Sequence, residues 1–128
     1  MLALDANVLV RLLVRDDAKQ AAAADKFIAH GAWVSHLVLA ETLWVLGAVY
    51  DTTAAQQITI VEMLLGHENL VLQDADTVTA ALAHFQKKPA LGFSDCLVLE
   101  IARKAGHVPL GTFDRVLAKL PGAQALKS

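Results

Sequence analysis

Four acidic side chains differ from the other acids of the chain because each lies beside or within an apolar run. Asp5 and Asp114 each follow a short apolar segment, Asp95 opens a third, and Glu41 lies in the middle of a fourth. A carboxylate among apolar side chains is unfavourable unless it is paired or binds a metal. The sequence offers no Cys or His at the spacing of zinc ligands. Four hard oxygen ligands predict Mg²⁺ or Mn²⁺ instead.

Each of these acids also has a purely structural interpretation. Asp5, Asp95 and Asp114 could cap helices, since aspartate is a favoured N-cap residue. Glu41 could pair with a buried arginine, or lie on a narrow polar edge together with Thr42. These explanations must all hold separately, whereas one cluster of carboxylates around a divalent cation explains the four acids together. The pattern therefore favours a metal site.

The elements that would position these acids are short apolar strands alternating with helical patterns. Strands are expected at residues 2–4, 32–35, 70–72, 108–110 and 123–126. Helices are expected from about residue 7 to 14, over 17–30 and 37–50, from 52 or 53 to 65, from 74 or 76 to 87, from 94 or 95 to 104, and over 116–120. This alternation predicts an α/β fold with a mainly parallel sheet covered on both faces. In such sheets ligands bind at the carboxyl ends of the strands, which is where Asp5 falls.

Composition limits the remaining possibilities. A chain of 128 residues is expected to form one domain, residues 1–128, and its 55% hydrophobic content favours an oligomer or an obligate partner. No apolar run is long enough to span a bilayer, and the single cysteine, Cys96, suits a reducing cytoplasm. The net charge of −2 gives no basic field for nucleic acid. Trp33 is expected in the core, and Trp44 in the core or at a partner interface.

The motifs that carry these acids resemble those of the PIN domain. The resemblance rests on Leu-Asp5-Ala-Asn7, on Glu41 in an apolar helix, on Phe-Ser94-Asp95 and on Thr112-Phe-Asp114. The order and spacing of the four acids are its most specific part. Length and element order are similar to those of VapC-type toxin ribonucleases from bacterial toxin–antitoxin pairs. The resemblance implies a three-layer α/β/α sandwich with a short, mainly parallel sheet of four to five strands.

The resemblance also implies a chemistry. Asp5, Glu41, Asp95 and Asp114 would bind one or two Mg²⁺ ions (or Mn²⁺), which activate water and orient a scissile RNA phosphate. Family members leave a 5′ phosphate and a 3′ hydroxyl. Asn7 and Thr112 would hold acids or bound waters through hydrogen bonds, although a helix cap and a turn hydroxyl explain them equally well. Ser94 is expected to be a plain cap.

Partners follow from the same resemblance. RNA needs cations that contact its phosphates, and the candidates nearest to the motifs are Arg11, Arg15 and Arg115. A toxin of this type is held by an antitoxin, for which the apolar segment 37–50 and its neighbour to residue 65 could form a groove wall. A homodimer and a cytoplasmic location are also expected.

Other interpretations of the sequence remain open. A housekeeping RNA-processing nuclease of the PIN fold would carry the same acids. An aspartate-dependent phosphatase would use Asp5, but it needs a second aspartate where Asn7 stands, and a phosphorylated receiver domain needs a lysine after Thr112. A non-enzymatic interaction domain would explain the hydrophobicity and leave Glu41 unexplained.

Overall fold

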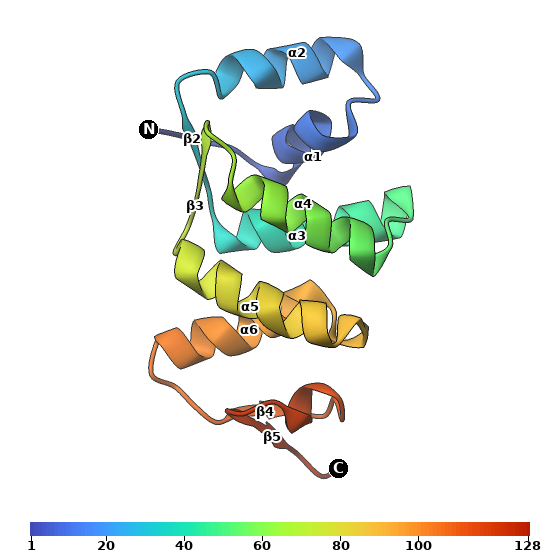
Figure 1. Ribbon diagram of the computed structural model, residues 1–128, viewed down its shortest axis with the longest axis vertical. Coiled ribbons are helices and arrows are strands. Elements are labelled where there is room, and N and C mark those ends of the chain that lie inside the picture. The colour runs from blue at the N-terminus through green and yellow to red at the C-terminus, as the bar shows by residue number, and fades with distance from the viewer. The chain divides into compact units, whose positions relative to one another are not determined.

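The computed structural model describes all residues of the chain, 1–128, which cluster into two compact units, Met1–Ala75 and Asp76–Ser128. Figure 1 labels most of their elements, which are numbered in chain order. The first unit contains β1 (Leu2–Ala3), α1 (Ala6–Val14), α2 (Ala18–Phe27), β2 (Ala32–Val34), α3 (His36–Tyr50), α4 (Ala54–Leu65) and β3 (Leu70–Leu72). The second contains α5 (Ala75–Lys87, beginning at the boundary), η1 (Pro89–Leu91), α6 (Phe93–Lys104), β4 (Leu110–Thr112), η2 (Leu117–Lys119) and β5 (Ala123–Ala125). No helix has the length and apolar character needed to cross a membrane.

Every strand pair is parallel, which confirms the predicted sheet type. In the first unit the sheet has the order β1-β2-β3, and in the second unit β4 pairs with β5. The predicted five strands are therefore present, but they form two separate sheets. The two connections within the first sheet each contain two helices, as parallel pairing requires. That residues 1–128 form a single domain stays a prediction.

Alternation along β2 decides the position of Trp33. Ala32 and Val34 are buried, whereas the Trp33 side chain points to the other face and is 37% exposed. Trp33 lies in register with Ala3 and Val71, which are also exposed. The expectation that Trp33 belongs to the core was wrong, because three residues of a strand do not reveal which face is covered.

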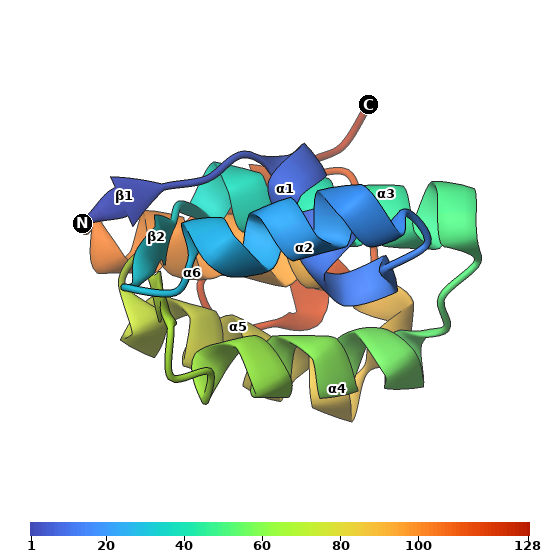
Figure 2. The same ribbon diagram turned by 90° about the horizontal axis from the view of Figure 1, so that it is seen from above.

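Side-chain caps fix where most helices of the first unit begin. Asp17 accepts a hydrogen bond from the Gln20 amide, and Ser35 accepts one from Val38. Thr53 forms a capping box with Gln56, in which each side chain binds the other residue's backbone. Figure 2 shows α1 and α2 lying against each other in this unit. The starts expected from the sequence agree with these caps to within one or two residues.

Helix α3 buries one face and exposes the other. Leu39, Thr42, Leu43 and Leu46 are buried, at the spacing of one helical stripe. The opposite face carries large apolar side chains in water: Leu37 is 68% exposed and Trp44 69%. The apolar pattern all round this helix predicted burial or a partner, and in the structure only half of it is buried.

The second unit is held by apolar packing between α5 and α6 and by one buried carboxylate. The rings of Phe85 and Phe93 meet edge to face at 6.2 Å between centroids. Glu100 is 7% exposed and accepts hydrogen bonds from Arg103 Nε at 3.1 Å and from His84 Nε2 at 3.2 Å. This cluster ties the two helices together through a charge that is almost fully removed from water.

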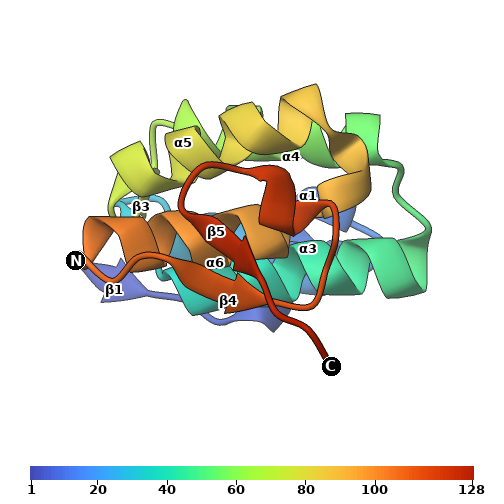
Figure 3. The ribbon, with the colours of Figure 1, turned by 90° about the horizontal axis from the view of Figure 1, so that it is seen from below.

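Strand β4 lies two residues later than the sequence predicted. It begins at Leu110, and the pairing with β5 runs through Thr112, which had been expected in a turn. Pro109 has no N–H to donate to a strand neighbour, so the ladder begins after it. Figure 3 shows β4 and β5 side by side at this end of the chain.

Candidate functional site

Asp5 lies between the end of β1 and the first turn of α1. Its Oδ1 accepts a hydrogen bond from the Val8 amide at 3.0 Å, so it is the N-cap of α1. The second carboxylate oxygen, Oδ2, makes no hydrogen bond. Capping and metal binding are therefore compatible at this residue, since each needs one oxygen. The neighbouring Asn7 is exposed in the first turn of α1.

Glu41 lies on the exposed face of α3 and not in the core, which corrects the expected burial. Its carboxylate forms no ion pair with an arginine and no hydrogen bond. The predicted polar edge with Thr42 is also wrong, because Thr42 is buried and donates to the Val38 carbonyl. Glu41 and Asp5 instead line one cavity of about 370 Å³ in the first unit.

Asp95 is in the first turn of α6 without capping it. The N-cap of this helix is Gly92, which has no side-chain hydrogen bond, and the helix begins at Phe93. The capping interpretations of Asp95 and Ser94 are therefore wrong. Asp95 is an exposed residue whose carboxylate is partly buried; this partial burial, and in second place the nearby charge of Asp114, raise the pKa of Asp95. A cation bound between these two carboxylates would relieve their repulsion.

Asp114 organises the turn after β4 through one oxygen. Its Oδ1 accepts hydrogen bonds from the amides of Val116 at 2.8 Å and Leu117 at 3.1 Å, while Oδ2 makes none. Thr112 Oγ1 accepts a hydrogen bond from the Asp114 amide at 3.0 Å. Thr112 thus holds the backbone of Asp114 as a turn hydroxyl, and its support of an acid or a bound water stays a prediction.

Two pairs of carboxylates therefore arise, one in each unit. In each pair one acid is fixed by backbone amides (Asp5, Asp114) and the other makes no hydrogen bond (Glu41, Asp95). No group of three or more acidic, histidine or cysteine side chains gathers as a metal site. Mg²⁺ keeps several waters and commonly uses one or two carboxylates, so donors of this type and number fit it.

Cys96, beside Asp95, does not offer a nucleophile. The thiol is buried, and burial together with the charge of Asp95 raises its pKa to about 11. A thiol with this pKa stays protonated near neutral pH, and only the thiolate is reactive.

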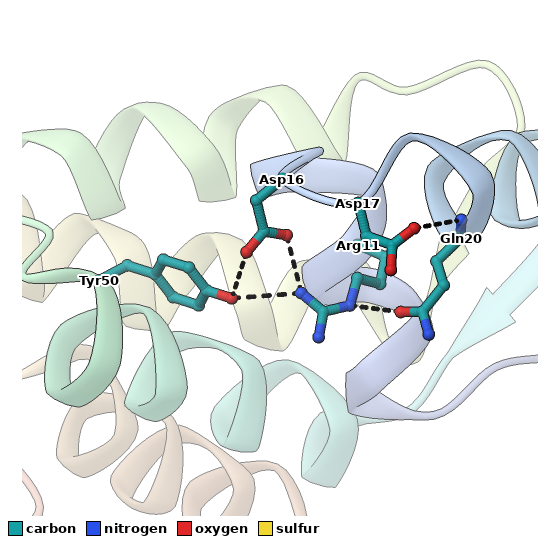
Figure 4. A network of polar contacts seen from close by, with 5 residues as sticks. All are labelled: Arg11, Asp16, Asp17, Gln20 and Tyr50. Atoms are coloured by element: carbon teal, nitrogen blue, oxygen red, sulfur yellow. Dashed lines mark hydrogen bonds and ion pairs between the residues drawn. The ribbon is translucent and has the colours of Figure 1, made fainter.

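Arg11 is held in place by three neighbours, as Figure 4 shows. Its Nε donates to Gln20 Oε1 at 2.6 Å, and Nη1 donates to Asp16 Oδ1 at 2.7 Å and to the Tyr50 hydroxyl at 3.3 Å. Nη2 makes no hydrogen bond. Arg11 also lines a second cavity, of about 390 Å³, which is shared with Asp5 and Asn7.

The other two predicted arginines differ from Arg11. Arg15 binds Asp25 with both terminal nitrogens, at 3.0 and 2.6 Å, so its donors are largely used within the chain. Arg115 is exposed next to Asp114 and forms no ion pair.

Sequence reasoning missed the support of Arg11 and the position of Trp44. Gln20, Asp16 and Tyr50 come from separate elements, and no pattern in the sequence joins them. Trp44 follows Glu41 by three residues, so helical spacing alone places both on one face. That signal was present, but the apolar surroundings favoured a core or interface role.

Comparison with known protein families identifies the PIN domain, which matches residues 2–123 and so includes all four acids. A search of curated proteins finds no match. The PIN fold is of the nuclease type, and PIN domains are generally metal-dependent nucleases that use divalent ions.

Proposed function

Because this chain belongs to the PIN domain family, we propose that it is a Mg²⁺- or Mn²⁺-dependent endoribonuclease. In this proposal Asp5, Glu41, Asp95 and Asp114 together hold the cation. The observation that carries it is the state of their oxygens: Asp5 and Asp114 use one oxygen for the backbone, and Glu41 and Asp95 use none. Carboxylates left without partners in this way suit a hard divalent ion.

The reaction is hydrolysis of a phosphodiester in RNA. A divalent cation held by these four carboxylates would supply an activated water and neutralise charge on the phosphate. The water oxygen forms a bond to phosphorus while the bond between phosphorus and the 3′ oxygen breaks. The products are a 5′ phosphate and a 3′ hydroxyl, whose proton comes from the solvent.

The residues of this chain have separate tasks in that reaction. Thr112 holds the backbone of Asp114 and thereby fixes the direction of its carboxylate. Asn7, exposed beside Asp5, offers an amide that can hold a water in the same cavity. Arg11 contacts a substrate phosphate through Nη2, because its other nitrogens are already bound and hold the guanidinium in place.

Arg115 is the second phosphate contact of the proposal, since it is exposed beside Asp114. Arg15 is left out, because its two terminal nitrogens bind Asp25. Phosphate would have to displace a carboxylate there, whereas Arg11 Nη2 and Arg115 need no such exchange.

The proposal extends to a toxin of a toxin–antitoxin pair that acts as a homodimer. Exposed apolar side chains support protein partners: Phe27 lines the cavity beside Arg11, and Leu37 and Val49 lie in water on α3. An antitoxin segment with apolar side chains would lie along the exposed face of α3, and a second copy of the chain would cover another of these apolar surfaces. Growth arrest on expression, relieved by the product of a neighbouring gene, distinguishes this role from housekeeping RNA processing.

Cleavage of labelled single-stranded RNA tests the enzymatic proposal. Wild type and Asp5→Asn are each assayed with Mg²⁺, Mn²⁺ or EDTA. Asparagine keeps the cap of α1 and removes the charge. We expect cutting by the wild type that needs metal and disappears in the variant. Equal cutting by both proteins, or cutting in EDTA, would contradict the proposal.

A further inference from the structure

Trp44 is an exposed aromatic side chain beside the acids of the first unit. It follows Glu41 by one turn of α3, and its side chain is 69% exposed. The cavity of about 370 Å³ that Asp5 and Glu41 line has Trp44 and Val45 as its apolar wall. One hollow therefore combines two carboxylates with a large flat ring that is mostly exposed.

The chemistry of this cavity favours one kind of ligand. A protein surface that covered the indole would also remove the two carboxylates from water. This burial is energetically unfavourable unless the covering surface carries cations that pair with them. A nucleobase would cover the ring with its own aromatic face, while its phosphate would stay with a cation held by the acids. Residues three apart on a helix have Cβ atoms about 5–6 Å from each other, which keeps the base close to that phosphate.

We propose that Trp44 is a stacking platform for an unpaired base of the RNA, next to the phosphate that is cut. This inference rests on the proposed function, whose site it extends. Bases in a duplex already stack on their neighbours, so the platform selects single-stranded RNA. The cavity that holds Arg11 shares Asp5 and Asn7 with this one. The substrate would then meet the Arg11 guanidinium in one cavity and the Trp44 ring in the other.

Fluorescence of Trp44 tests the stacking directly. The chain has two tryptophans, so Trp33→Phe leaves Trp44 as the only one. This protein is titrated in Ca²⁺, in place of Mg²⁺, with a short unpaired RNA and with an abasic strand of equal length. We expect quenching by the RNA and none by the abasic strand, because only the former has bases to stack. Equal responses to the two strands, or no quenching by RNA, would overturn the inference.

Substitution measures how much the platform contributes. Stacking on one aromatic side chain corresponds to about a 5- to 150-fold change in affinity, so Trp44→Ala is expected to weaken RNA binding and raise KM within this range. Trp44→Phe keeps a ring and should recover most of the loss. The matched control is Met63→Ala, which removes an exposed apolar side chain of α4 that does not line the cavity. Unchanged affinity in Trp44→Ala, or an equal loss in Met63→Ala, would contradict the platform.

The outcomes separate this inference from the proposed function. Metal-dependent cutting without quenching would overturn the platform alone. Quenching without cutting would leave the platform and overturn the nuclease. If Trp44 instead contacts a second copy of the chain, Trp44→Ala and Leu37→Ala would both lower the mass measured by sedimentation, with RNA affinity unchanged.

Discussion

The two pairs of carboxylates share one arrangement, an acid held by backbone amides and an acid without hydrogen bonds, but different local structures produce it. In the first unit the fixed acid caps a helix and the second acid, Glu41, lies in the middle of another helix. In the second unit the fixed acid caps a turn and the second acid, Asp95, lies in the first turn of α6. Each pair thus joins a carboxylate held by backbone amides to one without a structural partner.

This difference within each pair explains why capping does not argue against a metal site. An aspartate that binds an amide through Oδ1 is held in direction, and its Oδ2 remains for a ligand. The other acid of each pair, Glu41 or Asp95, makes no hydrogen bond, so no contact within the fold explains why an acid stands there. The asymmetry therefore separates two kinds of acid, which substitution can distinguish.

The largest effects are expected from the two acids without hydrogen bonds. Glu41→Gln and Asp95→Asn should each lower RNA cleavage by about 100-fold or more, because a metal ligand matters at least as much as the groups that support it. Stability should change by less than about 0.5 kcal/mol for Glu41→Gln. Glu62→Gln, at an exposed glutamate of α4, is the control and should cut normally. Full activity in Glu41→Gln or Asp95→Asn would show that this acid is not a metal ligand.

The units should also differ in how their ion pairs contribute to stability. Arg103→Ala leaves the buried Glu100 without its arginine and is expected to cost about 2–3 kcal/mol. Arg15→Ala removes an exposed pair with Asp25 and should cost less than about 1 kcal/mol. Urea denaturation measures both. Equal costs would show that burial of Glu100 does not govern the difference.

Thr112→Val tests the support of the fixed acid in the second unit. Valine keeps the shape of threonine but cannot accept the hydrogen bond from the Asp114 amide. We expect cleavage to fall by about 10-fold, with metal affinity reduced by a similar factor. Thr112→Ser keeps the hydroxyl and should restore most of the activity. If Thr112→Val cuts RNA as well as wild type, the Thr112 hydroxyl would stabilise only the turn and would have no role in the metal site.

The smallest expected effect is a change in the titration of Asp95. Burial is the larger cause of its raised pKa and the charge of Asp114 the smaller, so Asp114→Asn should lower the pKa without returning it to the ordinary value. Carboxyl ¹³C shifts of the metal-free protein measure it. A pKa that is higher in the folded state lowers the free energy of unfolding as pH rises past the ordinary value of about 4. Asp95→Asn should remove this loss above that pH and change nothing below it.

Much of the fold could be predicted from periodicity and capping residues. The helix starts at Asp5, Asp17 and Thr53 follow from side chains that bind their own backbone, which is a local property. Strand β4 begins later than predicted because Pro109 has no N–H, so the strand pairing starts only after it. The hydropathy of the sequence does not indicate this.

The exposure of Glu41, Trp33 and Trp44 could not be predicted in the same way. An apolar helix and an apolar strand each have two faces, and only the tertiary packing decides which face is covered. The four acids were identified from their apolar surroundings, yet Glu41 lies on an exposed face. The argument from burial at Glu41 was therefore wrong, and its role as a metal ligand stays a prediction.

We propose that the four acids, Asp5, Glu41, Asp95 and Asp114, bind one metal ion. Mn²⁺ binding, followed by the EPR signal of the free ion, tests it in wild type, Asp5→Asn, Asp114→Asn and the double variant. Asparagine retains both caps, so loss of folding does not interfere. We predict that each single variant weakens the same binding event by more than about 10-fold. If each single variant instead abolished one Mn²⁺-binding event and left a second at wild-type affinity, the two pairs would be independent sites. That result would contradict the proposal of one shared metal site.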